Sequence, residues 1–203
     1  MIVEFLGIPG SGKTYKANLY KKELEDKGVP YIDLSRWKGT PFWLKCFYKI
    51  TDFAYIIVPR YRKLRKKIYS LSKHNYNKEP KYLPFSIDYC IQRIISSILV
   101  RDFFRFCKKI SINDEGLMQW VVFLNVQYEI EITDILLLLK TMKSNSKTIF
   151  IDTPIETAFT NIKKRNRHIC PMDEMDDEML IGYLTDFRKS CYMIKNSETL
   201  IKS

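Results

Sequence analysis

The chain of 203 residues is long enough for one domain with a substantial core, and its 46% hydrophobic and 28% charged residues are ordinary for a globular protein. Its formal net charge of +11 is high, which indicates an anionic partner such as nucleotide phosphates, a nucleic acid, an acidic saccharide or a lipid surface. Five scattered cysteines without a C-x-x-C pair argue against a disulfide framework or a zinc site, and neither a secretory signal nor an apolar run of ~18 residues is present, so we expect a cytoplasmic protein.

The first predicted element is a phosphate-binding loop. Residues 7–14, GIPGSGKT, match the pattern G-x-x-x-x-G-K-[ST] at every fixed position. An apolar strand over residues 1–6 precedes the loop, and a helix over residues 14–27 follows it and ends at Gly28. Glycines let successive backbone N–H groups form an anion-binding nest, and the helix directs its positive dipole end at the same point. The residues expected to bind the donor nucleotide are Gly7, Pro9, Gly10, Ser11, Gly12, Lys13, Thr14 and Tyr15.

This motif predicts that the protein binds a nucleoside triphosphate such as ATP together with Mg²⁺. Lys13 is expected to reach the β- and γ-phosphates, and the Thr14 hydroxyl is expected to ligate the metal ion. A glycine-rich turn that binds nothing is the alternative, but the two flanking elements favour a phosphate site. The motif alone does not specify the fate of the phosphate.

A second strand is predicted over residues 29–34, with Asp33 near its end. In an open parallel sheet the carboxyl ends of the strands line the ligand crevice. Asp33 is therefore a candidate catalytic acid or base beside the acceptor, and the alternative is an aspartate that caps a turn.

Residues 36–84 are predicted to form a basic, aromatic, helical insertion within a single domain that spans residues 1–203. From Pro59 to Tyr82 the chain has nine lysines or arginines and one acid, Glu79. Aromatic residues alternating with cations suit an acidic acceptor, an anionic membrane surface or a nucleic acid. The alternative is a solvated basic helix whose aromatic side chains pack on the domain.

A long helix is predicted over residues 86–106, where isoleucines and leucines recur at helical spacing. Its arginines, Arg93 and Arg101, either point into the site or, as we expect, point outward into solvent.

The second informative stretch delivers two acids to a strand end. A short strand over residues 110–112 leads to Asp114 and Glu115, and Gly116 permits a tight turn into the next helix. A strand-end acid is what a phosphate-loop enzyme needs to hold Mg²⁺, directly or through water. We therefore assign Asp114 to the metal and Glu115 to the role of base or nucleophile-positioning residue. An ordinary Asp-Glu-Gly turn is the alternative.

The chain then continues with alternating elements. They are a helix over residues 117–126, a helix over residues 133–143 with Thr133 as its N-cap, a strand over residues 147–152, a helix from residue 154, a helix with an apolar stripe over residues 180–194, and a last short strand over residues 199–202.

The helix from residue 154 carries a candidate arginine lid. It begins with a predicted capping box, Thr153 to Glu156, with Pro154 at its first position, and it ends in a basic cluster over residues 163–168. Arg165 and Arg167 are predicted to close over the transferred phosphoryl group, an effect worth up to about 10³–10⁵ in rate. The alternative is a basic helix end favoured by the helix dipole.

Five strands alternating with helices predict a three-layer α/β/α architecture with a five-stranded parallel sheet, the phosphate-loop NTPase fold. Residues 5–14, residues 112–116 and residues 150–167 resemble the phosphate-loop nucleoside and nucleotide kinases, in particular the thymidylate-kinase-like group. The third stretch is similar to that group's fourth strand, following helix and arginine-bearing lid. The resemblance implies an ATP- and Mg²⁺-dependent phosphotransferase.

The sequence departs from that group at the acceptor side. Asp114-Glu115 stands where thymidylate kinases have an Asp-Arg pair, residues 33–36 match their acceptor site poorly, and the usual helix after the fifth strand is missing. The sequence therefore predicts a kinase that transfers the γ-phosphoryl group to a small acceptor such as a nucleoside, nucleotide or sugar.

Two other functional classes remain open at this point. One is a phosphate-loop ATPase or NTP-dependent switch, in which Glu115 activates water. The other is a basic module that binds a nucleic acid or a membrane surface and keeps a nucleotide for regulation.

Overall fold

The structure, a computed structural model, describes residues 1–35, 41–72, 78–140, 146–165 and 170–202. Its strands are β1 (Ile2–Leu6), β2 (Tyr31–Asp33), β3 (Ile110–Asn113) and β4 (Ser146–Phe150). Its helices are α1 (Lys13–Asp26), α2 (Phe42–Ile57), α3 (Pro59–Leu71), α4 (Ile87–Phe104), α5 (Leu117–Tyr128), α6 (Ile132–Lys140), α7 (Ile155–Arg165) and α8 (Asp177–Lys202), with a 3₁₀ turn at Pro171–Glu174. The predicted alternation of strands with helical segments is confirmed as far as α7.

All strand pairs of the sheet are parallel, and the strand order is β2-β3-β1-β4. The two central strands are therefore β1, which leads into the phosphate loop, and β3, which leads to Asp114. Val3 of β1 lies opposite Ile112 of β3, so the two strands end side by side. This register brings two motifs that are about a hundred residues apart in the sequence to the same edge of the sheet.

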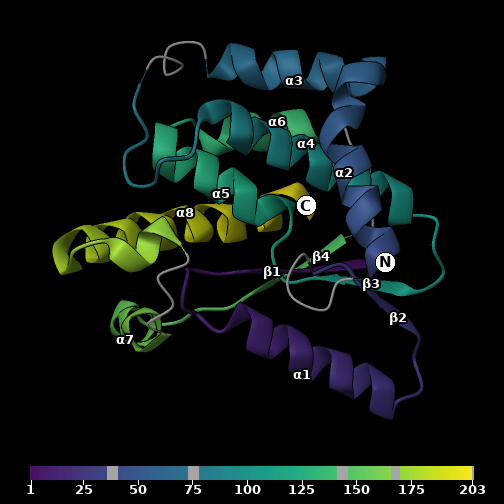
Figure 1. Ribbon diagram of the computed structural model, residues 1–203, viewed down its shortest axis with the longest axis horizontal. Helices are drawn as coiled ribbons and strands as arrows, with labels where there is room; N and C mark the ends of the chain where they lie inside the picture. Colours follow the sequence, from purple (N-terminus) through teal and green to yellow (C-terminus); the bar gives the residue numbers. More distant parts are fainter. Residues whose placement is uncertain (36–40, 73–77, 141–145, 166–169, 203) are drawn as a thin grey trace.

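The side chains of β1 alternate between two helical layers. Val3 and Phe5 pack with Ala17 and Leu24 of α1 on one face of the sheet. Leu6 faces the other way and belongs to the large core formed with α4, α5 and α8. Figure 1 shows these layers, with α1 below the sheet and the larger group of helices above it. The three-layer α/β/α phosphate-loop fold predicted from the sequence is thus confirmed.

The fifth predicted strand is wrong. Residues 199–202 form the last turn of α8 instead, and the sheet has four strands in the part of the chain that the structure describes. No glycine or proline interrupts the sequence from Tyr183 to Lys202, so extending the helix adds one hydrogen bond per residue at little cost. The β-propensity of Thr199 and Ile201 does not outweigh that gain.

Two predicted helix starts also differ. Helix α6 begins at Ile132, so Thr133 lies inside the helix and is not its N-cap. Helix α7 begins at Ile155, after Pro154, and the Thr153 hydroxyl donates to the Ser11 carbonyl oxygen over 3.2 Å. Thr153 therefore ties the start of α7 to the phosphate loop.

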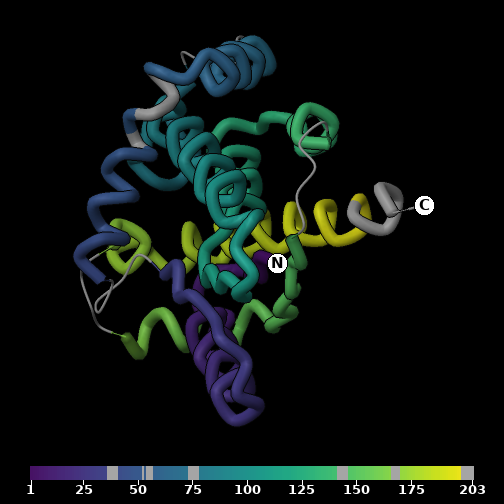
Figure 2. The backbone as a smooth tube through the Cα atoms, turned by 90° about the vertical axis from the view of Figure 1, so that its right-hand side faces the viewer, coloured from purple at the N-terminus to yellow at the C-terminus, as the bar shows by residue number. Residues whose placement is uncertain are grey.

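Of the segment over residues 36–84, α2 and α3 account for residues 42–57 and 59–71, whereas residues 78–84 are not helical. Helices α2 and α3 pack on α4 and meet each other at Val58, and Figure 2 shows both outside α4, away from α1. Leu44 and Tyr48 anchor α2, and the Tyr48 hydroxyl donates to the Leu34 carbonyl oxygen. Among the described helices, none combines the length and hydropathy needed to cross a lipid bilayer.

Candidate active site

The loop between β1 and α1 depends on two glycines with positive φ. Gly10 has φ +80° and Gly12 has φ +83°, a region that glycine adopts without steric cost. A Cβ at Gly10 would collide with the Ala158 carbonyl oxygen of α7, whereas a Cβ at Gly12 would meet no atom within 4 Å. Gly10 therefore allows α7 to pack closely on the loop, and Gly12 leaves open space at the N-terminus of α1.

Lys13 lies inside the loop that precedes it. Its ammonium donates to the carbonyl oxygens of Gly7 (2.9 Å) and Ile8 (3.1 Å), and its side chain is buried. Burial lowers the pKa of Lys13, and the negative charges of Glu115 and Asp114 oppose this shift. The loop thus holds a cation at its centre, beside two carboxyl groups, in an arrangement suited to phosphate oxygens.

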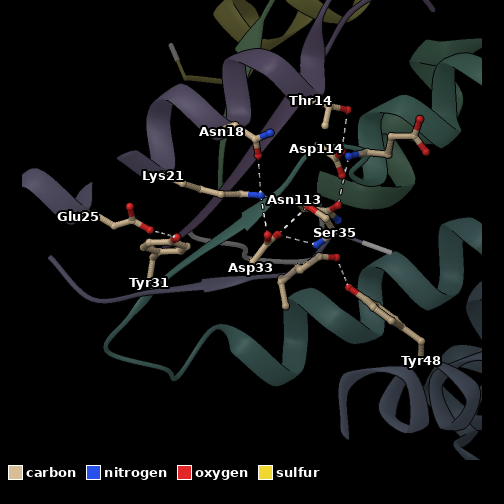
Figure 3. Close-up of polar contacts among 12 residues, drawn as sticks. Thr14, Asn18, Lys21, Glu25, Tyr31, Asp33, Ser35, Tyr48, Asn113 and Asp114 are labelled. Atoms are coloured by element: carbon tan, nitrogen blue, oxygen red, sulfur yellow. Dashed lines mark hydrogen bonds and ion pairs between the residues drawn. The ribbon is translucent and has the colours of Figure 1, made fainter. Parts of the chain in front are cut away.

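Thr14 and Asp114 meet as the two motifs predict. The Thr14 hydroxyl donates to the Asp114 carboxylate over 3.0 Å, as Figure 3 shows. Asp114 is only 1% exposed, and its other oxygen, Oδ1, is buried without a hydrogen-bond partner in the described structure. Burying a carboxylate oxygen without a hydrogen-bond partner costs free energy. The unpartnered Oδ1 of Asp114, next to Thr14, therefore points to a ligand that binds there.

These two residues fit a magnesium ion delivered with a triphosphate. A hydroxyl and a carboxylate supply the oxygen ligands that Mg²⁺ prefers, and phosphates and waters commonly complete its shell. Among the residues that the structure describes, no cluster of three or more His, Cys, Asp or Glu side chains could hold a metal ion alone. Thr14 and Asp114 would supply two of the oxygen ligands of such an ion.

Glu115 lies in the same electrostatic environment. Burial raises the pKa of its carboxyl above the usual value, the charges of Lys13 and Arg165 oppose this shift, and that of Asp114 adds to it. Arg165, at the exposed end of α7, therefore lowers the pKa of Glu115, and its place over a transferred phosphoryl group stays a prediction. Arg167 lies outside the described residues. A carboxylate with a raised pKa accepts a proton more readily than an ordinary glutamate, which suits a general base.

Asp33, the last residue of β2, is already held by an ion pair and by hydrogen bonds. Its carboxylate accepts hydrogen bonds from the Lys21 ammonium (2.6 Å) and from the hydroxyl (2.6 Å) and backbone N–H of Ser35 (Figure 3). Partial burial alone would raise the pKa of Asp33, but these hydrogen bonds lower it. Asp33 is therefore the weaker base of the two candidate acids.

The expectation that Arg101 points into solvent is wrong. Its guanidinium donates to both carboxylate oxygens of Glu4 over 2.9 and 2.6 Å, and both side chains are buried. Glu4 also accepts from the backbone N–H of Leu117, and a Cβ at Gly116 would collide with its carboxylate. This ion pair therefore supports the turn that follows Asp114 and Glu115.

Sequence reasoning missed Glu4 because a charged residue inside an apolar strand carries no local sign of its partner. It also missed Gln119, whose side-chain oxygen lies 3.5 Å from the backbone nitrogen of Gly7. Tyr15, predicted to contact the nucleotide, has a largely exposed side chain on the first turn of α1. The remaining residues predicted for the donor site, from Gly7 to Thr14, form the loop and the first two residues of α1.

Comparison with known proteins identified structural similarity only. No protein-family model matches the sequence, and no curated protein does either. Two solved structures of the deoxyadenosine kinase from M. mycoides are similar to this chain. The one with dCMP and a flexible dCDP has 14% identity and a TM-score of 0.49 over 98% of this chain and 85% of that one. The one with bound dATP has 15% identity and a TM-score of 0.49 over 98% and 86%.

Proposed function

We propose that this protein is an ATP- and Mg²⁺-dependent phosphotransferase that moves the γ-phosphoryl group to a small acceptor. The observation that carries the proposal is the contact between Thr14 and Asp114, which leaves one buried carboxylate oxygen without a partner beside the Lys13 loop. Such a triad of cation, hydroxyl and strand-end carboxylate is suited to a metal-bound triphosphate.

In this proposal the loop and Lys13 bind the donor phosphates, with Thr14 and Asp114 as ligands of Mg²⁺. When bound, Mg²⁺ offsets the negative charge of the phosphates. Lys13 now donates to two loop carbonyl oxygens, and it would exchange these partners for phosphate oxygens. Positioning and electrostatic stabilisation then supply most of the rate enhancement.

Glu115 is the proposed general base for the acceptor hydroxyl. Its raised pKa suits it to accept a proton, whereas Asp33 is bound to Lys21 and Ser35. Arg165 and Arg167 are proposed to approach the transferred group from the end of α7. Arg165 is exposed and already influences the pKa values of both Lys13 and Glu115, which supports this role.

The test is ATP consumption in the presence of candidate acceptors. ADP release would be measured with Mg²⁺ and with nucleosides, nucleoside monophosphates or sugars, and the phosphorylated product would be identified by mass spectrometry. We expect at least one acceptor to increase ADP release, and we expect Lys13→Ala to abolish the increase while Lys22→Ala, an exposed change on α1, retains it.

Two outcomes would contradict the proposal. ATP consumption that is the same with and without every acceptor would indicate an ATPase or NTP-dependent switch. Full acceptor-dependent activity in Lys13→Ala would remove the loop from the reaction.

A further inference from the structure

Helix α2 has two apolar faces, of which only one is covered. Leu44, Tyr48 and Thr51 are buried against the domain. Trp43, Ile50, Phe53 and Ile57 lie on the opposite side, and their exposed fractions are between 53% and 77%. These four residues, named here the α2 stripe, recur at intervals of seven, three and four residues and so follow one side of the helix for about 21 Å.

Neighbouring elements extend the exposed apolar surface at both ends of the α2 stripe. At the C-terminal end, Val58 joins Ile50, Phe53, Ile57 and the stem of Lys49 to line a shallow apolar groove. At the N-terminal end, the exposed ring of Phe103 lies 4.7 Å from that of Phe47, centroid to centroid. Contiguous exposed apolar surface of this kind marks an interaction site more often than scattered apolar residues do.

The charges of the segment that forms α2 and α3 are almost all of one sign, and two of its cations, Arg60 and Arg65, pair with acids of α4. Residues 41–72 contain eight lysines or arginines and one acid, Asp52. The exposed lysines of this segment are Lys45, Lys49, Lys63, Lys66 and Lys67. Helix α3 buries Tyr61, Leu64 and Ile68 and presents its basic side outward, and α2 and α3 form the outer layer of the molecule in Figures 1 and 2. The same layer therefore offers both aromatic anchors and cations.

From this combination we infer that the α2 stripe and the basic side of α3 dock onto an anionic lipid membrane surface. Exposed aromatic and aliphatic side chains enter the boundary between headgroups and acyl chains, and neighbouring lysines and arginines bind anionic headgroups. A second copy of the chain is a poorer occupant, because contact through this layer would bring two sets of like charges together. The protein would then lie on the membrane without crossing it.

The inference does not depend on the proposed phosphotransfer, since the α2 stripe contains none of the donor-site residues. Lys13→Ala is therefore expected to lose turnover and to retain membrane binding. A protein that turns over substrate but does not bind membranes would contradict only the docking proposal. A protein that binds membranes but has no turnover would contradict only the proposed function.

The experiment is co-sedimentation with vesicles of phosphatidylcholine alone or of phosphatidylcholine with about one third phosphatidylglycerol. We expect binding only to the anionic vesicles, and weaker binding as salt increases. Ile50→Ser/Phe53→Ser should weaken binding at least about tenfold, since it removes two anchors. Lys63→Glu/Lys66→Glu/Lys67→Glu should weaken it more, because each surface cation contributes roughly fivefold.

Matched controls carry the same changes elsewhere on the surface. Leu137→Ser/Ile181→Ser alters exposed apolar residues of α6 and α8. Lys22→Glu/Lys27→Glu/Lys189→Glu alters three exposed lysines, two near the C-terminal end of α1 and one on α8. Both controls should bind anionic vesicles as the unchanged protein does.

Three results would overturn the inference. One is absence of binding to the anionic vesicles by a folded protein. Another is equal loss of binding in the control variants. The third is a dimer in analytical ultracentrifugation that Ile50→Ser/Phe53→Ser dissociates, because a second copy would then occupy the surface.

Discussion

The phosphate-loop region and the α2–α3 layer contrast in how their functional side chains are held. At the loop, Lys13 and Asp114 are buried and fixed by contacts that reach across the sheet edge. In the α2–α3 layer, Trp43, Phe53 and the lysines of α3 are exposed. A reaction needs preorganised, desolvated groups, whereas a surface that meets another surface needs accessible ones. The contrast suggests chemistry at one end of the molecule and attachment at the other.

The largest expected effect is at Lys13. Replacement by alanine removes the cation that the loop holds where we propose that the donor phosphates bind, and we expect turnover to fall by about 10³-fold or more. Steady-state kinetics would measure the loss, and circular dichroism would confirm that the fold is kept. Substantial remaining turnover would mean that the loop region is not the reactive end of the molecule.

The next largest effect is on stability, at the buried ion pair under the Asp114–Glu115 turn. Arg101→Met leaves the Glu4 carboxylate buried without its partner, which typically costs about 3–5 kcal/mol. Urea unfolding would measure this cost. Arg105→Met, at an exposed position just after α4, should change the free energy of unfolding by less than about 0.5 kcal/mol. Similar values for the two variants would show that the pair does not support the turn.

A smaller effect is expected in the pH dependence of turnover. Burial raises the pKa of Glu115, so its basic form is lost as the pH falls through a value above that of an ordinary glutamate. Glu115→Gln should reduce kcat by about 10²–10⁴-fold and remove this acidic limb. Asp33→Asn should leave the limb in place, because hydrogen bonds already lower the pKa of Asp33. A limb that disappears in Asp33→Asn would make Asp33 the base.

The raised pKa of Glu115 also predicts in which direction the stability of the protein changes with pH. Between its unfolded and folded pKa values the folded protein binds more protons, so the contribution of Glu115 to stability decreases as the pH rises. Glu115→Gln should therefore be as stable as the unchanged protein at neutral pH, or more stable. Thermal unfolding at neutral pH measures this, and a lower melting temperature would be inconsistent with the buried position of the carboxyl group.

The smallest effect on chemistry is expected in the α2–α3 layer. Ile50→Ser/Phe53→Ser changes exposed side chains away from the loop, so turnover of a water-soluble acceptor and the free energy of unfolding should both stay close to those of the unchanged protein, within about 0.5 kcal/mol. A large loss of turnover in this variant would place the acceptor on α2 and would erase the distinction between the two regions.

The sequence predicted the loop and its neighbourhood to Asp114 because the signals for both are local. The loop residues, the strand before them and the helix after them are contiguous, and the strand-end position of Asp114 follows from a four-residue pattern. Once β1 and β3 are neighbours in a parallel sheet, the contact between Thr14 and Asp114 needs no further information.

Part of what the sequence did not predict depends on long-range pairing. The partner of Glu4 is Arg101, ninety-seven positions away, and nothing near either residue indicates the other. The fifth strand failed for a local reason, since uninterrupted helical hydrogen bonding continued through residues 199–202. The α2 stripe could be recognised as amphipathic, but which of its two apolar faces is covered depends on how α2 packs on α4.

The most direct test of the central claim is calorimetric titration of ATP into the protein with and without Mg²⁺. If Thr14 and Asp114 hold the metal beside the Lys13 loop, Mg²⁺ should tighten ATP binding, and Asp114→Asn should lose about tenfold or more of that gain while the exposed change Asp134→Asn keeps it. ATP binding that is equally strong without Mg²⁺, or a Mg²⁺ effect that survives in Asp114→Asn, would contradict the account.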